Sequence, residues 1–323
     1  MARIRSLARR KRLLVLSASM DAALVRIAGA TMSVRTANGF PATELGAAIS
    51  ATMPPFTSFR AIPRTYFGPK DLRHEQFCGL IIPVRHIDLT FSSPAENIAC
   101  DEALLDLCEA RSADEVLRFW ESSTPFVVVG YGNHVDVEVN RSACEKDGVP
   151  ILRRCSGGGA VVQGPGCLNY SLVLKIDPHL ELASITAANC HIMKRNAAVL
   201  SKLLGKNICV EGYTDLAVDG RKFSGNAQRR KRTHLLFHGT FLLENFDLTL
   251  LSRYLKHPSR EPEYRSTRSH GDFVARLSLN SLQVKSALRE EWGANKTLKT
   301  IPDEPMRTLI AMRYSRTEWN FKF

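Results

Sequence analysis

Three consecutive glycines, residues 157–159, mark the segment best suited to chemistry. They follow an apolar run that ends in Arg153 and Arg154, and another β-rich run comes after them. Glycine loses the most backbone entropy on folding, so a triple glycine between strands indicates close backbone approach to a ligand. Free N–H groups in such a loop form a nest for an anion, and an arginine adds a planar charged fork. The segment therefore predicts a phosphate or carboxylate site. The alternative is a glycine-rich hairpin with two surface arginines.

A second polar segment, residues 212–228, combines a carboxylate, a lysine and a pair of small residues. Lys222 follows a tight turn and leads into Ser224 and Gly225, which again allow close backbone approach. A lysine is a compact point charge suited to an acyl carbonyl or a phosphate. Asp215 is a candidate Mg²⁺ ligand or a turn cap. Taken alone, Lys222 also fits an ordinary solvated surface lysine.

The positive charge of the chain is concentrated at one end. The 323 residues carry a net charge of +12, and residues 1–70 hold eleven Lys and Arg against two acidic residues. The remaining residues lack the basic footprint of nucleic-acid binding. The Arg-, Ala- and Ser-rich residues 1–84 are typical of an organelle transit peptide, mitochondrial or plastid. The alternative is an unstructured extension of a cytoplasmic protein.

Neither a membrane span nor a metal or disulfide framework is predicted. The most apolar segment, residues 13–32, is interrupted by Asp21 and Arg26. The eight cysteines are scattered, and they include no CxxC pair or other metal-ligand spacing. We therefore expect free thiols, as in a reducing compartment.

Helix and strand patterns are mixed along the rest of the chain. Residues 184–204 form the clearest helix, because apolar side chains recur at helical spacing and Gly205 closes it. Residues 93–111 form another, with a capping box of Ser93 and Glu96. Several hairpin signals predict an α+β fold, with a mixed, mostly antiparallel sheet and flanking helices. Further helices are expected at 141–147, 250–256 and 281–292, and strands at 87–91, 117–120, 125–130, 148–152, 168–174, 207–211, 215–218, 222–227 and 235–243.

The order of the motifs is more informative than any one of them. Five motifs in this order resemble the lipoate–protein ligase A family: NIACDEALL (97–105), RRCSGGGAV (153–161), LNYSL (168–172), DLAVDGRKFSGNAQRR (215–230) and LLFHGTFLL (235–243). The resemblance implies a biotin/lipoate-ligase catalytic domain, related to the class II synthetase core. It divides the chain into a basic extension (1–84), the catalytic domain (85–275) and a C-terminal helix and tail (276–323).

The resemblance also implies a reaction in two steps. Mg·ATP activates the carboxylate of lipoate or octanoate as an acyl-adenylate, and a lysine amine then takes the acyl group. The implied acceptors are apo lipoyl domains of E2 subunits of 2-oxoacid dehydrogenases and the glycine cleavage H protein. Donors placed where charge develops would stabilise the transition state, without a nucleophile from the enzyme.

The site residues carried over from the family fall into three groups. Lys222 is the catalytic residue, expected to contact both phosphate and acyl oxygen, and Asp215 is a tentative Mg²⁺ ligand. The nucleotide-phosphate positions are Arg154, Gly159, Ala160, Val161, Val162 and Lys222. The lipoate-binding positions are Ser156, Gly157, Gly158, Lys222, Ser224, Gly225, His238 and Gly239. Taken alone, His238 also fits a buried structural histidine.

Two departures from the family pattern matter. Thr214 precedes Asp215 where the family often has Asn, which weakens the case for a metal ligand. Fuller-length ligases carry a C-terminal accessory domain, and residues 313–321 resemble its opening strand. This predicts either a separate accessory ligase subunit or a chain that performs part of the reaction.

Other functions stay open. An ATP-independent octanoyltransferase would use a cysteine thioester, and Cys209, thirteen residues before Lys222, is the candidate nucleophile. The Phe and Pro-Ser that accompany that cysteine in such transferases are absent here, and Cys155 inside the glycine loop is expected to be a small structural residue. A lipoyl-nucleotide-dependent lipoyltransferase and a non-enzymatic binding subunit are further alternatives. The sequence does not distinguish lipoate from octanoate.

Overall fold

The structure is a computed structural model, and it describes residues 84–110, 114–177 and 181–323. The predicted N-terminal extension and its targeting signal lie outside the described residues, apart from residue 84. The predicted α+β class with a mostly antiparallel sheet is confirmed. Within the described residues, no helix combines the length and the apolar character needed to cross a bilayer.

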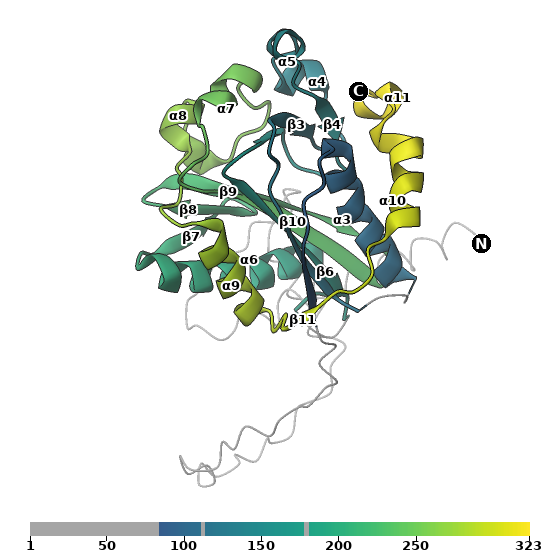
Figure 1. The fold of residues 1–323 in the computed structure, drawn as a ribbon. Coiled ribbons are helices and arrows are strands. Elements are labelled where there is room, and N and C mark those ends of the chain that lie inside the picture. The colour runs from purple at the N-terminus through teal and green to yellow at the C-terminus, as the bar shows by residue number, and fades with distance from the viewer. Residues whose placement is uncertain (1–83, 111–113, 178–180) are drawn as a thin grey trace, which may run out of the picture. The chain divides into compact units, whose positions relative to one another are not determined.

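An eight-stranded sheet forms the centre of the fold (Figure 1). Its strand order is β11-β1-β2-β6-β10-β9-β8-β7. Strand β1 pairs in parallel with both of its neighbours, and the remaining pairs are antiparallel. The strands are β1 (Arg85–Asp88), β2 (Val116–Trp120), β6 (Cys167–Lys175), β7 (Ile208–Glu211), β8 (Asp215–Val218), β9 (Arg221–Arg230), β10 (His234–Leu242) and β11 (Lys296–Thr297).

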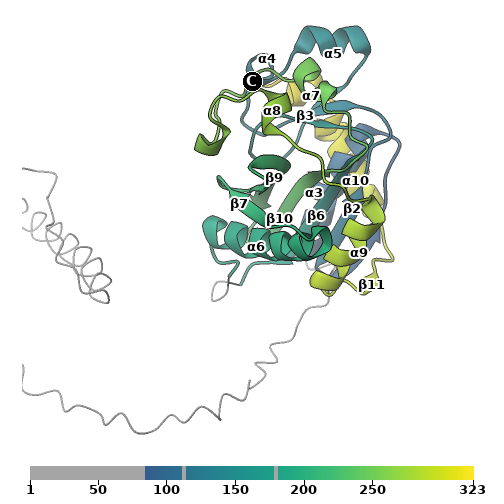
Figure 2. The same ribbon diagram turned by 90° about the vertical axis from the view of Figure 1, so that its left-hand side faces the viewer.

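Helices cover both faces of this sheet (Figures 1 and 2). One face packs against α6 (Ile185–Leu204) and α9 (Ser281–Glu291), and the other packs against α3 (Pro94–Glu109), which in turn contacts α10 (Asp303–Leu309). Helix α6 has the predicted ends: Ser184 accepts from the Ala187 N–H, and Gly205 closes the helix at φ 67°. Because the sheet is covered on both sides, β6 is buried along almost its whole length.

Helix α3 begins where the sequence predicts, but its N-terminal contacts differ. The Ser93 side chain makes no capping hydrogen bond, so the predicted capping box is wrong. Asn97 closes this turn instead. Its amide donates to the carbonyls of Phe91 (2.8 Å) and Ser93 (3.1 Å), and its Oδ1 accepts from the Phe91 N–H. The buried amide satisfies more backbone groups than a serine hydroxyl can.

A second sheet of three strands carries the glycine loop, which comprises residues 154–160. Strand β3 (Phe126–Val129) lies between β4 (Ile151–Arg153), with which it is parallel, and β5 (Val161–Gln163), with which it is antiparallel. The glycine loop therefore links two strands that flank β3, rather than closing a hairpin. Short helices surround this sheet: α4 (Val135–Glu138), α5 (Arg141–Asp147), α7 (Thr249–Tyr254), η1 (Glu263–Arg265) and α8 (His270–Phe273).

The C-terminal segment is helical, which corrects the predicted strand at residues 313–321. Helix α10 is followed by a π-helical turn, η2 (Ile310–Tyr314), and by α11 (Thr317–Asn320). Met306, Leu309 and Tyr314 are buried against α3, and this helical spacing of large side chains explains the conformation. Helix α11 packs against β4.

Candidate active site

A cavity of about 870 Å³ lies between the glycine loop and strands β8–β10. Every predicted site residue lines it except Ser156, which is buried directly behind the wall. The predicted residues that line it are Arg154, Gly157, Gly158, Gly159, Ala160, Val161, Val162, Asp215, Lys222, Ser224, Gly225, His238 and Gly239. The fold thus brings two segments that are distant in sequence to one chamber.

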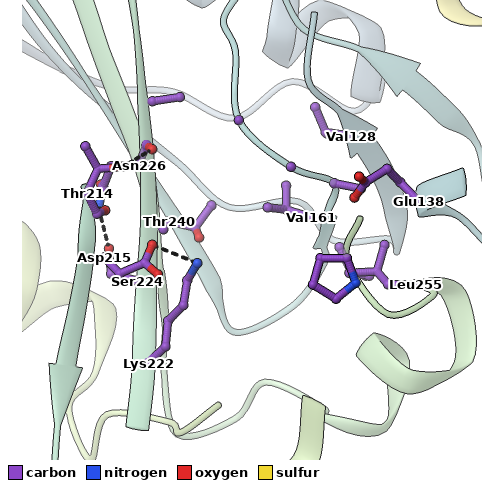
Figure 3. A pocket seen from close by; sticks show the side chains of 18 of the residues that line it. Val128, Glu138, Val161, Thr214, Asp215, Lys222, Ser224, Asn226, Thr240 and Leu255 are labelled. Carbon is purple, nitrogen blue, oxygen red and sulfur yellow. Dashed lines mark hydrogen bonds and ion pairs between the residues drawn. The ribbon is translucent and has the colours of Figure 1, made fainter. Parts of the chain in front are cut away.

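Lys222 extends from β9 into this cavity and pairs with Asp215 of β8 (Figure 3). Its Nζ lies 2.8 Å from Asp215 Oδ1. The Tyr264 hydroxyl donates to the other carboxylate oxygen, also at 2.8 Å. A Cβ on Gly225 would lie 3.1 Å from Nζ, so the absence of a side chain there leaves room for the lysine. Burial and the Asp215 charge raise the pKa of Tyr264 well above its usual value, which keeps it a donor.

Both carboxylate oxygens of Asp215 are engaged in this arrangement, and its role as a Mg²⁺ ligand stays a prediction. A cation occupies one of its oxygens and a hydroxyl donor the other. Across residues 84–110, 114–177 and 181–323, no group of three or more His, Cys, Asp or Glu side chains could hold a metal ion. In this structure Asp215 holds Lys222 in place.

The glycine loop is folded around the Arg154 guanidinium. Arg154 donates to the carbonyls of Gly157 (2.6 Å) and Gly159 (2.8 Å) and to the hydroxyl of Ser156 (3.1 Å). Burial lowers its pKa to about 10. In the described part of the chain, no hydrogen bond uses the N–H groups of the three glycines. Unpaired N–H groups can bind an anion, and the anion site at this loop stays a prediction.

Arg153 binds different backbone groups from those that Arg154 binds. The alternative of a surface arginine pair is wrong, because Arg153 has no exposed surface and Arg154 is 8% exposed. Arg153 does not line the cavity, and it donates to the carbonyls of Gly130 and Asn133, both at 2.8 Å. Burial lowers its pKa.

A chain of polar contacts connects the loop to α3. His238 Nε2 lies 2.6 Å from Ser156 Oγ, and its Nδ1 faces Asp101 Oδ2 at 3.6 Å. The other Asp101 oxygen accepts from the fully buried Arg118 at 2.5 Å. Burial alone would raise the pKa of Asp101, but Arg118 and His238 together hold it below its usual value. Asp101 is therefore an ionised carboxylate that only accepts hydrogen bonds.

The negative Asp101 carboxylate favours the tautomer of His238 that carries its proton on Nδ1. In that tautomer Nε2 accepts from the Ser156 hydroxyl. The expectation of a structural histidine is therefore only half right. His238 is held by buried groups, yet it lines the cavity.

The described cysteines divide into buried and exposed ones. Cys155 is buried, and burial raises the pKa of its thiol to about 12, as expected for a structural residue. Cys209 of β7 is exposed and does not line the cavity. The strand register pairs it with Ala217, which pairs with Lys222. Cys209 and Lys222 therefore share a sheet face, separated by two strand spacings, or about 10 Å.

Sequence reasoning missed several residues that build the site. Arg118 and Tyr264 carried no local signal, because their importance arises from contacts with Asp101 and Asp215. Asp101 belongs to a motif that supported the resemblance, but that motif gave it no role. Glu138 and Leu255 lie across the cavity from Lys222 (Figure 3).

Residues 93–289 match the family model of the lipoyl protein ligase A/B catalytic domain. The chain belongs to this family. The motifs on the glycine loop, β9 and β10 lie within the matched residues. The relatives of this chain include both lipoate ligases and octanoyltransferases.

Relatives of both kinds are similar to this member of the lipoyl ligase family. The octanoyltransferase LipM of Carboxydothermus hydrogenoformans is 31% identical over 74% of this chain and 98% of its own length. The lipoate-protein ligase LplJ of Bacillus subtilis is 26% identical over 71% of each chain. Among solved structures, a bi-partite lipoate protein ligase of Thermoplasma acidophilum, studied with its E2 lipoyl domain, has a TM-score of 0.63 at 25% identity. It covers 74% of this chain and 96% of its own.

Proposed function

We propose that the protein is a lipoate–protein ligase that activates lipoate or octanoate with ATP and joins the acyl group to a lysine of a lipoyl domain. One observation carries the proposal: Lys222 and the glycine loop, whose glycine N–H groups form no hydrogen bond within the described residues, line one cavity that no described cysteine lines. Overall, the acyl carboxylate and the lysine amine form an amide, and ATP leaves as AMP and pyrophosphate.

The two walls of the cavity offer complementary chemistry. The glycine-loop N–H groups suit phosphate oxygens, as a nest does for anions. Lys222, held by Asp215, supplies a positive charge from the opposite wall. Such preorganised donors stabilise developing charge without reorganisation during the reaction. Mg²⁺ would be delivered with the nucleotide, and no further step is assigned to it.

The acceptor side of the proposal is a lipoyl domain. A structural neighbour is a bi-partite ligase that was studied with its E2 lipoyl domain. By analogy, we propose E2 lipoyl domains and the glycine cleavage H protein as acceptors. A separate accessory subunit, as in a bi-partite enzyme, is compatible with this proposal.

A second candidate is octanoyl transfer through Cys209. The similarity to LipM over nearly the whole length of that protein favours it, as does the position of Cys209 on the sheet face of Lys222. The transfer would form a thioester at Cys209 with release of the donor thiol, and the acceptor lysine would then displace the cysteine. This candidate requires β7 to approach the cavity, because Cys209 lies outside it.

Release of pyrophosphate separates the two candidates. We expect wild type mixed with Mg·ATP to release pyrophosphate only when lipoate or octanoate is added, and Lys222→Met to lose this release. If neither acid elicited pyrophosphate, while octanoyl-acyl carrier protein supported transfer that Cys209→Ser abolished, the ligase proposal would be wrong.

A further inference from the structure

Arg153 is a buried cation without a carboxylate partner in the described chain. Five backbone carbonyls accept its side-chain N–H groups. Three of them belong to residues 130–133, at 2.8 to 3.2 Å. The other two belong to Trp319 and Asn320 of α11, both at 3.1 Å. Arg153 thus joins the C-terminal segment to the loop that follows β3.

The main chain of Arg153 is held by the same two residues of α11. Asn320 Oδ1 accepts from the Arg153 N–H at 3.0 Å. The indole N–H of Trp319 donates to the Arg153 carbonyl at 2.9 Å. Asn320 is itself fixed by its amide, which donates to the Tyr314 carbonyl at 3.1 Å. The contact is therefore specific in geometry and not only apolar packing.

Lys322 provides a second anchor on the same loop. Its Nζ lies 3.5 Å from the ring centroid of Tyr131, 4.4 Å from Trp319 and 4.8 Å from Phe323. The faces of aromatic rings attract cations, and an ammonium group within this range of three rings is held by all of them. Tyr131 belongs to the loop that Arg153 binds.

The loop after β3 sets the position of the glycine loop. The Tyr131 N–H donates to the Ser156 carbonyl at 2.8 Å. Gly130 lies so close to Gly158 that a Cβ on Gly130 would lie 1.9 Å from the Gly158 carbonyl oxygen. A displacement of residues 130–131 would therefore be transmitted directly to residues 156–158.

We propose that residues 313–323, the C-terminal clamp, hold the glycine loop at the separation from Lys222 that substrate binding requires. Asn320 and Lys322 are positioning residues, because they act through Arg153 and Tyr131 rather than on the substrate. The kinetic part of the test rests on the proposed function. The hydrogen-exchange part does not, so the two can fail separately.

The first test compares Lys322→Met with Lys322→Arg in the full chain, by amide hydrogen exchange without ligand. We expect Lys322→Met to accelerate exchange about two- to fivefold at the amides of Tyr131 and Asn133, which donate to the carbonyls of Ser156 and Gly130. This is the size of an exposed cation–aromatic contact. Lys322→Arg keeps the cation and should restore protection. Arg307→Ala removes an exposed cation of α10, outside residues 313–323, and should change neither amide. Unchanged exchange in Lys322→Met would overturn the proposal.

The second test uses Asn320→Ala and steady-state kinetics. We expect the KM for ATP to rise about tenfold or more, as when a buried hydrogen-bonding group loses its partner, while kcat falls less. A tenfold fall of kcat at an unchanged KM for ATP would contradict the proposal that the clamp positions the glycine loop for phosphate binding. Should no ATP-dependent activity exist at all, the proposed function fails, and the exchange comparison still decides the clamp.

Discussion

The hydroxyl of Ser156 lies 2.6 Å from Nε2 of His238, 82 residues further along the chain. This contact joins the glycine loop of the small sheet to β10 of the large one. Because Asp101 faces the other ring nitrogen and Arg118 binds Asp101, the loop is linked through buried groups to α3 and β2. The cavity wall is therefore a network whose members should not act independently.

We expect Ser156→Ala and His238→Ala to be strongly non-additive. Each substitution removes the same hydrogen bond, so each should lower kcat/KM by a similar factor, and the double variant should be little worse. A double-mutant cycle should give a coupling energy of about 0.5–3 kcal/mol. Purely additive effects would mean that the contact has no functional weight.

Lys222→Met should lower the rate by about a hundred- to a thousandfold, the usual effect of removing one preorganised donor. Its side chain is 30% exposed, so the free energy of unfolding should change by no more than about 1 kcal/mol. Lys206→Met is the matched control, because Lys206 forms an ion pair with Asp219 at the same distance of 2.8 Å but outside the cavity. A rate in Lys222→Met within threefold of that control would contradict the assigned role.

Gly130→Ala and Gly132→Ala make a matched pair within one loop. A Cβ at Gly130 meets the Gly158 carbonyl at 1.9 Å, whereas a Cβ at Gly132 has nothing within 4 Å. We expect Gly130→Ala to displace the glycine loop and destroy substrate binding, with a loss of stability of about 1–3 kcal/mol from overpacking. Gly132→Ala should remain active. The measurements are calorimetric binding of ATP and thermal unfolding, and equal behaviour of the two variants would refute the close contact.

The buried Asp101 should make stability depend on pH. Its folded pKa is depressed, so its stabilising contribution is full above the unfolded value of about 3.9 and is lost as pH falls through the folded pKa. Asp101→Asn leaves Arg118 buried without a carboxylate, which should cost about 3–5 kcal/mol at pH 7. Urea unfolding of both proteins should show this difference shrinking below about pH 4. A constant difference down to pH 2 would rule out an ionised Asp101.

Local patterns in the sequence predicted most of the fold. The ends of α6 follow from Ser184 and Gly205, and the strands β8 to β10 follow from alternation and turns. The C-terminal helices were mistaken for a strand, because their short apolar pattern is decided by packing against α3. Periodicity alone does not separate short helices from strands in such runs.

The candidate site could be predicted in membership but not in arrangement. Motif order placed the glycine loop, Lys222 and His238 together, and all three contribute to one cavity or its wall. Arg154 lines the cavity and Arg153 does not, and this difference depends on residues more than a hundred positions away, such as Asn320. The engagement of Asp215 by Tyr264 depends likewise on a distant segment, so no local signal could predict this contact.

Acyl transfer to an apo lipoyl domain tests the central claim most directly. Labelled lipoate or octanoate is supplied with and without Mg·ATP, and octanoyl-acyl carrier protein is supplied as the alternative donor, to wild type and to Cys209→Ser. We predict label on the lipoyl-domain lysine only with ATP, at the same rate in both proteins. Transfer from octanoyl-acyl carrier protein without ATP, lost in Cys209→Ser, would contradict the ligase account.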